Sequence, residues 1–223
     1  MKKLKFKPEA IIFDMDGVIV DSMPYHYLAW YEALRSYGVR VTCFDVYSKE
    51  GERWQKSLED FLKRAHIEPS RKIIDKIFIE RQKIFKRYFK RFIFKGVKEF
   101  LLCLKNQGYV LGLVTGTPTS EVKKILSKNI RDLFSGIVGG DNVKKGKPNP
   151  DPYLKAARMF KVRPGECLVV ENAPYGIESA KRAGMFCIAL ATSLPKEYLC
   201  RADIVVNDLE EITGIIEQSC RVK

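Results

Sequence analysis

The sequence predicts an α/β fold, with a doubly wound parallel sheet as its core and a set of helices inserted into it. Two observations lead to this prediction. Short apolar runs recur along the chain, and from residue 96 onward they alternate with helical stretches, as in parallel sheets covered on both faces. Residues 22–94 instead contain several helical patterns and no convincing buried strand. We therefore expect an α/β core domain of residues 1–21 and 95–223 and an inserted helical cap domain of residues 22–94.

The expected strands are the short apolar runs, beginning with Ala10-Ile11-Ile12-Phe13. They cover residues 10–13, 110–114, 136–139, 167–170, 186–190 and 204–206. Apolar residues at helical spacing predict the helices. In the cap these cover residues 25–37, 54–65 and 70–88, and in the core 96–107, 120–127, 152–160 and 175–183. Because the cap follows the first strand directly, we expect it to lie as a lid over the end of that strand.

The composition is that of a globular protein in a reducing compartment. Of the 223 residues, 46% are hydrophobic and 30% are charged. No apolar run approaches the roughly 20 residues that cross a bilayer, and the lysine-rich start has no apolar signal stretch, so we expect a cytoplasmic protein with no membrane partner. The six cysteines form no C-x-x-C pair, which indicates buried thiols rather than disulfides or a zinc site. We expect a monomer, with a dimer as the alternative.

Much of the net charge of +13 lies in residues 71–91. Apolar residues recur there at helical spacing, so we predict an amphipathic helix whose lysines and arginines, Arg81 among them, form a solvated face. No groove-reading motif accompanies the charge, so nucleic acid is not the expected partner. A nucleic-acid-binding protein on an inactive scaffold is the distant alternative. A basic surface would also attract anionic metabolites such as phosphate esters.

Two carboxylates follow the first predicted strand, in Asp14-Met15-Asp16-Gly17. Ligands of open α/β sheets bind outside the carboxyl ends of the strands, and strand alternation would point Asp14 and Asp16 to the same side. One carboxylate could attack phosphorus to form an aspartyl phosphate, while the second passes protons to and from the oxygens. Two acids that merely solvate the end of a strand are the plainer interpretation, and the pair alone does not decide between them.

Three later clusters also stand at predicted strand ends. Thr115-Gly116-Thr117 offers hydroxyl and N–H groups for phosphate oxygens, although a threonine there could simply cap the following helix. Lys147 stands in a loop stiffened by Pro148 and Pro150, where it could neutralise both carboxylates and phosphoryl charge. Glu171-Asn172 ends a buried strand. The oxygens of Asp14, Asp16, Glu171 and Asn172 are the hard ligands that Mg²⁺ prefers.

In this order and spacing the clusters resemble the four motifs of the haloacid dehalogenase superfamily. The resemblance is to its β-phosphoglucomutase-like and phosphoglycolate phosphatase-like subgroup, which has a helical cap after the first strand. It runs from about residue 9 to about residue 207 and implies a Rossmann-like core. Asp14-Met15-Asp16-Gly17-Val18, Thr115, Gly146-Lys147-Pro148-Asn149-Pro150-Asp151 and Glu171-Asn172-Ala173-Pro174-Tyr175-Gly176 carry it.

By this resemblance Asp14 is the nucleophile, and Asp16 is the general acid and base whose main-chain carbonyl also contacts Mg²⁺. Thr115 and the N–H groups near Gly116 and Thr117 would hold the phosphoryl oxygens. Lys147 would bridge the nucleophile and the phosphate. The resemblance thus makes Asp14, Asp16, Thr115 and Lys147 the catalytic set.

One position departs from the subgroup, which often has Glu-Asp where this chain has Glu171-Asn172. Asn172 still offers a carbonyl oxygen but carries one negative charge fewer, so either it or Glu171 would complete the metal site. Two further residues are candidates for substrate contact. His26 follows the acids at the entrance to the cap, and Arg53 stands in a predicted cap loop. Each could equally be a surface or packing residue, and His66 is expected to be structural.

Three functions are compatible with these residues. The predicted one is a Mg²⁺-dependent phosphatase that hydrolyses a small phosphate ester, such as a sugar phosphate or phosphoglycolate, through an aspartyl phosphate. A sugar phosphomutase of the β-phosphoglucomutase kind would use the same site and return the phosphoryl group to the sugar. The nucleic-acid-binding alternative depends on the net charge of +13 alone.

Overall fold

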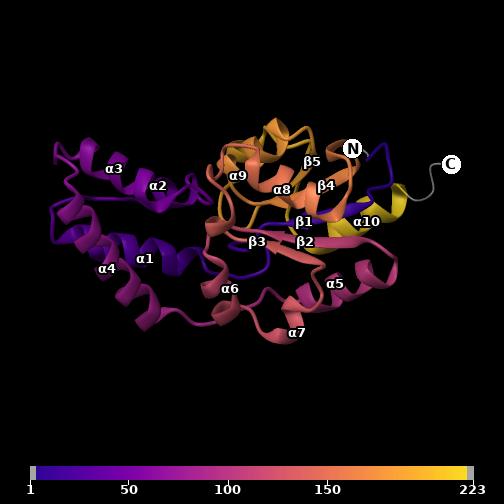
Figure 1. Cartoon of the computed structure of the whole chain (residues 1–223), viewed down its shortest axis with the longest axis horizontal. Coiled ribbons are helices and arrows are strands. Elements are labelled where there is room, and N and C mark those ends of the chain that lie inside the picture. The colour runs from indigo at the N-terminus through magenta and orange to yellow at the C-terminus, as the bar shows by residue number, and fades with distance from the viewer. Residues whose placement is uncertain (1–3, 220–223) are drawn as a thin grey trace.

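A six-stranded parallel sheet forms the centre of the molecule. The computed structural model describes residues 4–219, and its sheet has the order β3-β2-β1-β4-β5-β6 (Figure 1). The strands are β1 (Ala10–Phe13), β2 (Val110–Val114), β3 (Gly136–Val138), β4 (Cys167–Glu171), β5 (Phe186–Leu190) and β6 (Ile204–Val206). All six predicted strands are present to within one residue. The strand order reverses at β1, which confirms the predicted doubly wound α/β fold.

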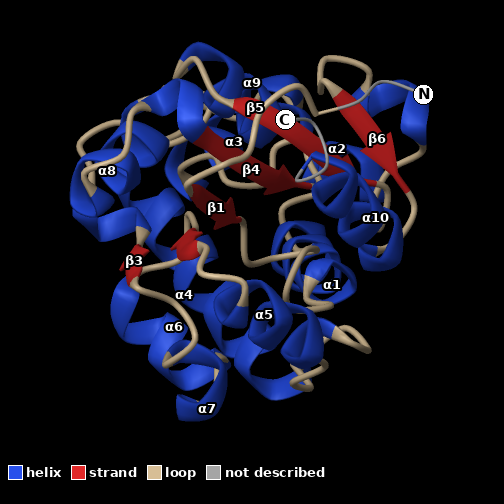
Figure 2. Cartoon of the chain, turned by 90° about the vertical axis from the view of Figure 1, so that its right-hand side faces the viewer, coloured by secondary structure: helices blue, strands red, loops and turns tan. Residues whose placement is uncertain are grey.

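Helices cover both faces of the sheet (Figure 2). The core helices are α5 (Val97–Asn106), α6 (Thr119–Ile125), α7 (Lys128–Arg131), α8 (Asp151–Phe160), α9 (Pro174–Arg182) and α10 (Leu209–Ser219). Side chains alternate along β1, so Ile11 and Phe13 pack in one cluster with α5, α6 and α10. Ala10 and Ile12 pack in the other, with α8 and α9. Burial on both faces explains why the strands are continuous apolar runs.

The cap consists of four helices that pack on one another. They are α1 (Met23–Arg35), α2 (Cys43–Tyr47), α3 (Trp54–Arg64) and α4 (Arg71–Tyr88), and they lie beyond the sheet on one side of the molecule (Figure 1). Their own apolar cluster includes Trp30, Leu58 and Phe61. Residues 22–94, all of which the structure describes, contribute no strand to the sheet.

The predicted helices correspond to seven of the observed ones, whereas α2, α7 and α10 were not predicted. With five and four residues, α2 and α7 are too short to show a helical period. In α10, Ile212, Ile215 and Ile216 do recur at helical spacing and pack against the sheet. No helix within residues 4–219 has the length and the apolar character needed to cross a bilayer.

Candidate active site

Asp14 and Asp16 lie just beyond the carboxyl end of β1. The sheet ladder continues to the first of them, because the N–H of Asp14 donates to the carbonyl of Val170 over 3.0 Å. Gly17 then turns the chain with φ of +84°. Any side chain would be strained in that conformation, and a Cβ atom there would lie 2.0 Å from Nδ2 of Asn172. Glycine therefore allows the β1 loop to approach the end of β4 closely.

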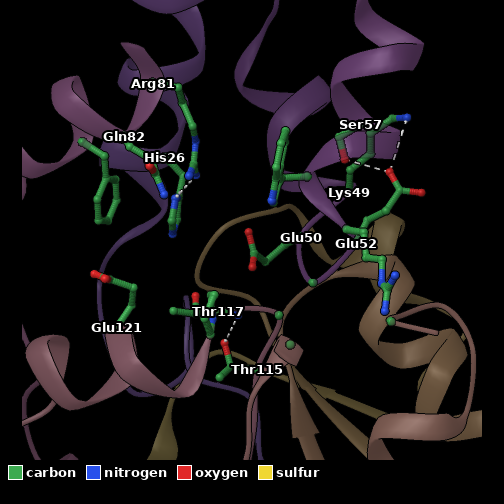
Figure 3. Close-up of a pocket in the computed structure, with 18 of the residues that line it drawn as sticks. His26, Lys49, Glu50, Glu52, Ser57, Arg81, Gln82, Thr115, Thr117 and Glu121 are labelled. Atoms are coloured by element: carbon green, nitrogen blue, oxygen red, sulfur yellow. Dashed lines mark hydrogen bonds and ion pairs between the residues drawn. The ribbon is translucent and has the colours of Figure 1, made fainter. Parts of the chain in front are cut away.

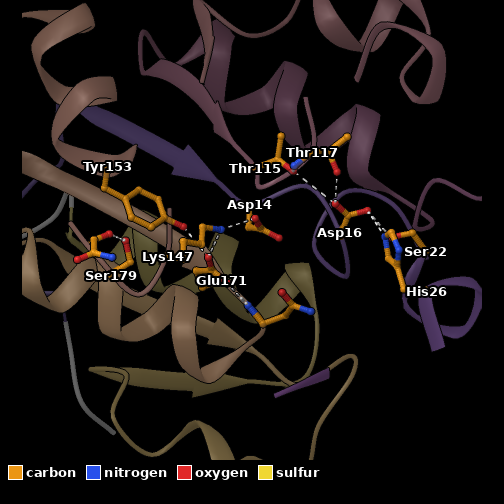
Figure 4. A network of polar contacts seen from close by, with 12 residues as sticks. Asp14, Asp16, Ser22, His26, Thr115, Thr117, Lys147, Tyr153, Glu171 and Ser179 are labelled. Carbon is orange, nitrogen blue, oxygen red and sulfur yellow. Dashed lines mark hydrogen bonds and ion pairs between the residues drawn. The ribbon is translucent and has the colours of Figure 1, made fainter. Parts of the chain in front are cut away.

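Lys147 joins the carboxylates of β1 and β4. Its Nζ donates to Oδ1 of Asp14 over 2.5 Å and to Oε1 of Glu171 over 2.6 Å, and Figure 4 shows it between the two. The side chain is buried, with 3% of the residue exposed. Burial alone would lower the pKa of Lys147, but the negative charges of Asp14 and Glu171 outweigh it and raise the pKa above its ordinary value. Lys147 is therefore a buried cation that faces the carboxyl groups of two buried acids.

Both carboxylate oxygens of Glu171 have partners within the protein. Oε1 accepts a hydrogen bond from Oη of Tyr153 over 2.6 Å in addition to the one from Lys147 (Figure 4). Oε2 accepts from the N–H of Asn172 over 2.9 Å. Tyr153 is fully buried on α8. These three donors orient Glu171 toward Lys147.

Two oxygens at the end of β1 and β4 are buried without a hydrogen-bond partner among residues 4–219. They are Oδ2 of Asp14 and Oδ1 of Asn172, whose Nδ2 donates to Oγ of Ser193 over 3.0 Å. Burial raises the pKa of Asp14 to about 8; Glu171 and Asp16 add to the rise, and Lys147 opposes it. Within residues 4–219, no three His, Cys, Asp or Glu side chains group into a metal site by themselves. Besides the carboxylate of Asp14, the amide of Asn172 offers a buried oxygen at this place.

Four donors surround the carboxylate of Asp16. Oδ1 accepts from Oγ of Ser22 over 2.5 Å and lies 3.3 Å from Nε2 of His26. Oδ2 accepts from the hydroxyls of Thr115 and Thr117, each over 3.4 Å (Figure 4). Burial alone would raise the pKa of Asp16, but the hydrogen bonds from His26 and Ser22 and the charge of Lys147 outweigh it and lower the pKa. Asp16 is thus held as a carboxylate.

His26 connects Asp16 to the cap. Its ring stacks on Phe85 with 4.6 Å between the centroids, and its Nδ1 accepts a hydrogen bond from Nη2 of Arg81 over 2.8 Å. Since Nδ1 is an acceptor, Nε2 carries the proton and donates to Asp16. Arg81 also lies over the ring of Trp30, 4.9 Å from its centroid. The prediction of a solvated face for α4 is wrong for Arg81, which is half-buried and turned toward the site.

A cavity of about 830 Å³ separates the cap from the end of the sheet. Thr115, Gly116, Thr117 and Lys147 line it on the core side. Aromatic side chains line it on the cap side, and they are Trp30, Trp54, Phe61, Phe78, Phe85 and Phe89. Figure 3 shows His26, Arg81 and Glu50 around the same space. The cavity is large enough for a ligand of metabolite or drug size.

A cap loop closes the cavity over the buried carboxylates. Gly51 lies directly on Lys147, because a Cβ atom there would be 2.4 Å from Cδ of that lysine. The next residue, Glu52, forms an isolated parallel bridge with Lys147. Arg53 is exposed and donates from Nη2 to the carbonyl of Val143 over 2.8 Å, which ties the loop to the core. Asp14 and Asp16 are each only 1% exposed beneath this loop.

The structure therefore brings most of the candidate residues together around Asp14 and Asp16. The group comprises His26, Thr115, Gly116, Thr117, Lys147, Glu171 and Asn172, whereas Arg53 contacts a core loop at the rim. Four side chains around the site were not predicted as part of it: Ser22, Glu50, Arg81 and Tyr153. Tyr153 follows the predicted Pro-rich loop, Ser22 lies between the acids and the first cap helix, and Glu50 and Arg81 lie among many other charges. No sequence signal distinguishes these four from their neighbours.

Comparison with known proteins gives a consistent assignment. Residues 8–184 match the model of a family described as haloacid dehalogenase-like hydrolase. The chain is 31% identical over 212 residues to the β-phosphoglucomutase of Bacillus subtilis, with 92% of each protein covered. It is 33% identical over 191 residues to a phosphorylated carbohydrates phosphatase of Thermotoga maritima, with 79% of this chain and 82% of the relative covered.

The three-dimensional comparison agrees with the sequence comparison. The crystal structure of a β-phosphoglucomutase from Clostridium difficile superimposes with a TM-score of 0.81 at 26% identity. The superposition covers 96% of this chain and 99% of the other. The similarity thus includes both the sheet and the cap helices.

Proposed function

Because this chain belongs to the haloacid dehalogenase-like hydrolase family, we propose that it is a Mg²⁺-dependent phosphatase that hydrolyses a small phosphorylated metabolite through an aspartyl phosphate. The family match confirms the resemblance predicted from the four motifs. One observation carries the proposal. Asp14 has one carboxylate oxygen held by Lys147, which lines a cavity of metabolite size, while its other oxygen is buried without a partner among residues 4–219.

The first step forms a bond between a carboxylate oxygen of Asp14 and phosphorus, and the P–O bond to the leaving group breaks. Lys147 and Glu171 hold Asp14 in place for this attack. Asp16 gives a proton to the leaving oxygen, which departs as an alcohol. A phosphate dianion beside Asp16 supplies the negative neighbour that raises its pKa and lets it carry that proton.

In the second step, water attacks the phosphorus of the aspartyl phosphate. Asp16, now a carboxylate, takes a proton from the water, and the bond between Asp14 and phosphorus breaks. The products are orthophosphate and the free Asp14 carboxylate. Thr115 and the N–H of Gly116 line the cavity where the phosphoryl oxygens would lie, and they bind those oxygens in both steps. Because Gly51 covers Lys147, the cap loop must move away to admit the ester.

The residues present fit a magnesium ion. Oδ2 of Asp14 and Oδ1 of Asn172 are buried acceptors that find no donor in the described part of the chain, and a hard cation would satisfy both. The main-chain carbonyl of Asp16 is the third proposed ligand. When bound, Mg²⁺ neutralises charge on Asp14 and on the phosphoryl group. Glu171 already uses both oxygens for protein donors, so we assign it the positioning of Lys147 instead of metal binding.

Phosphate release from a panel of sugar phosphates, phosphoglycolate and nucleotides tests this proposal. The assay contains Mg²⁺ and is repeated with EDTA. We expect release from at least one ester, its loss with EDTA, and none with Asp14→Asn as the blank. Release that persists in Asp14→Asn contradicts the assignment of the nucleophile, and no release from any ester contradicts the phosphatase.

The similarity to β-phosphoglucomutases favours a phosphomutase as the second candidate. That enzyme would use the same carboxylates but return the phosphoryl group to the sugar. Incubation with β-glucose 1-phosphate and Mg²⁺ separates the two functions. A bisphosphorylated sugar that forms and disappears without net phosphate release would identify the mutase.

A further inference from the structure

The cavity beside the proposed phosphoryl site contains a carboxyl group for which the mechanism has no use. Glu50 is half-buried in the cap loop, one residue before the Gly51 that covers Lys147. Its carboxyl group points into the open space between His26 and Thr117 (Figure 3). The ion pairs found within residues 4–219 do not include Glu50, although its loop neighbours Lys49 and Glu52 both take part in them. Apart from a hydrogen bond from the N–H of Gly51, the carboxyl group of Glu50 is available to a ligand.

Arg81 faces the cavity with unused hydrogen-bonding capacity as well. Nη2 contacts His26, whereas Nε is buried with no partner among the described residues. Figure 3 shows Arg81 and Glu50 on different sides of the space above Thr117. A leaving group attached to a phosphate held at Thr115 would extend into that space. It would meet a guanidinium, which only donates hydrogen bonds, and a carboxyl group.

A hydroxyl group suits both of these residues, because it can donate to Glu50 and accept from Arg81. A carboxylate in the leaving group could accept from Arg81 but would be repelled by an ionised Glu50. Burial, and then the negative charges of Asp16 and Asp14, raise the pKa of Glu50 well above its ordinary value. A hydroxyl would satisfy Glu50 in either protonation state.

Size and surface chemistry agree with a polyhydroxylated group. The two-carbon glycolate of phosphoglycolate would leave most of a cavity of about 830 Å³ to water. A five- or six-carbon sugar would bring C–H groups against half-buried aromatic rings such as Trp54 and Phe78, which stack on each other in the wall.

We propose that Glu50 is a specificity-determining residue that hydrogen-bonds a hydroxyl of an uncharged, polyhydroxylated leaving group, so that sugar phosphates are bound in preference to phosphoglycolate. This inference rests on the proposed function, because it places the phosphoryl group at Thr115 and Lys147.

Ligand binding to variants that cannot turn over tests this role. Calorimetry would measure the Kd of glucose 6-phosphate, fructose 1-phosphate, ribose 5-phosphate and phosphoglycolate for the full chain carrying Asp14→Asn, with Mg²⁺ present. The same titrations are then repeated with Asp14→Asn proteins that carry a second substitution. Glu50→Leu removes the hydrogen bond to the ligand, and Glu50→Gln keeps it. Glu121→Leu is the matched control, since this half-buried residue of the cavity wall already pairs with Lys124 over 2.6 Å.

Glu50→Leu should raise the Kd of the tightest-binding sugar phosphate by about tenfold or more and change the Kd of phosphoglycolate less than threefold. Glu50→Gln should retain most of the affinity for the sugar phosphate, and Glu121→Leu should change the Kd of neither ligand. Equal weakening of both ligand types, no weakening, or an Asp14→Asn parent that prefers phosphoglycolate would overturn the role of Glu50.

The hydrolysis panel keeps this test separate from that of the proposed function. A wild type that hydrolyses sugar phosphates, combined with an unchanged Kd ratio in Glu50→Leu, overturns only the inference about Glu50. A changed ratio in a protein that hydrolyses no ester overturns only the phosphatase.

Discussion

The Nζ atom of Lys147 donates to Oδ1 of Asp14 over 2.5 Å, although 133 residues separate them in the chain. The contact exists because β1 and β4 are neighbours in the sheet and the loop before α8 reaches back to their carboxyl ends. Glu171, at the end of β4, holds the other side of the same ammonium group. The three side chains form one buried charge network, and four measurements probe it and its surroundings.

Replacement of Lys147 should damage both stability and activity. Lys147→Met leaves the carboxylates of Asp14 and Glu171 buried without their cation, so we expect a loss of about 3 kcal/mol in the free energy of unfolding. Urea titration at neutral pH in EDTA would measure it, alongside phosphate release. Lys145→Met is the control, because Lys145 is exposed in the same loop. A Lys147→Met protein as stable as Lys145→Met would contradict the network.

Tyr153 should stabilise the fold by holding the carboxylate of Glu171 in place. Tyr153→Phe removes only the Oη donor to Oε1, and it leaves the ring in its fully buried position. We expect the free energy of unfolding to fall by about 2 kcal/mol, the usual contribution of a hydrogen bond to a charged acceptor. Thermal and urea unfolding would measure it against Tyr198→Phe, whose side chain is exposed. Equal stability of the two variants would show that this hydrogen bond does not hold Glu171.

Asn172→Asp should tighten Mg²⁺ binding by roughly tenfold, because it adds a negative charge at an oxygen that is buried and has no partner among the residues that the structure describes. The new carboxylate could still accept from the hydroxyl of Ser193, so the local fold is expected to persist. Calorimetric titration with MgCl₂ would measure the affinity. Asn106→Asp, on the exposed end of α5, controls for net charge. An unchanged affinity would count against Asn172 as a ligand.

Asp45 should make the stability of the cap depend on pH. Burial alone would raise the pKa of Asp45, but hydrogen bonds from Arg64 and Thr42 outweigh it and hold the pKa below its ordinary value of 3.8. A lowered pKa stabilises the fold above about pH 4, and this contribution is lost as the pH falls through the pKa of the folded state. We therefore expect Asp45→Asn to lower the free energy of unfolding by about 1 kcal/mol at pH 7 and by less below pH 4.

Urea unfolding of Asp45→Asn at several pH values, followed by tryptophan fluorescence, would test this dependence. Asp75→Asn is the matched control, because its exposed pair with Arg71 spans 3.9 Å and should contribute little. A difference between Asp45→Asn and wild type that stays constant from pH 7 to pH 3.5 would contradict the assignment.

Much of the architecture could be predicted from short segments. The strand Ala10–Phe13 is buried on both faces, so its residues are all apolar and its end is marked by Asp14. The same reasoning located all six strands to within one residue. The short helix α2 was not predicted, because five residues show no helical period. The helix α4 was predicted correctly, but Arg81 on it was expected to face solvent and instead faces the site.

The sequence by itself determined the class of chemistry, because Asp14, Asp16, Thr115 and Lys147 each follow a strand or occupy a loop at the same edge of a parallel sheet. Only the tertiary structure decided the partners of those groups. Glu171 faces Lys147 and Tyr153, and one oxygen of Asn172 has no hydrogen-bond partner within residues 4–219. The reason is physical: secondary structure depends on residues a few positions apart, whereas a buried charge is satisfied by donors that folding brings from distant parts of the chain.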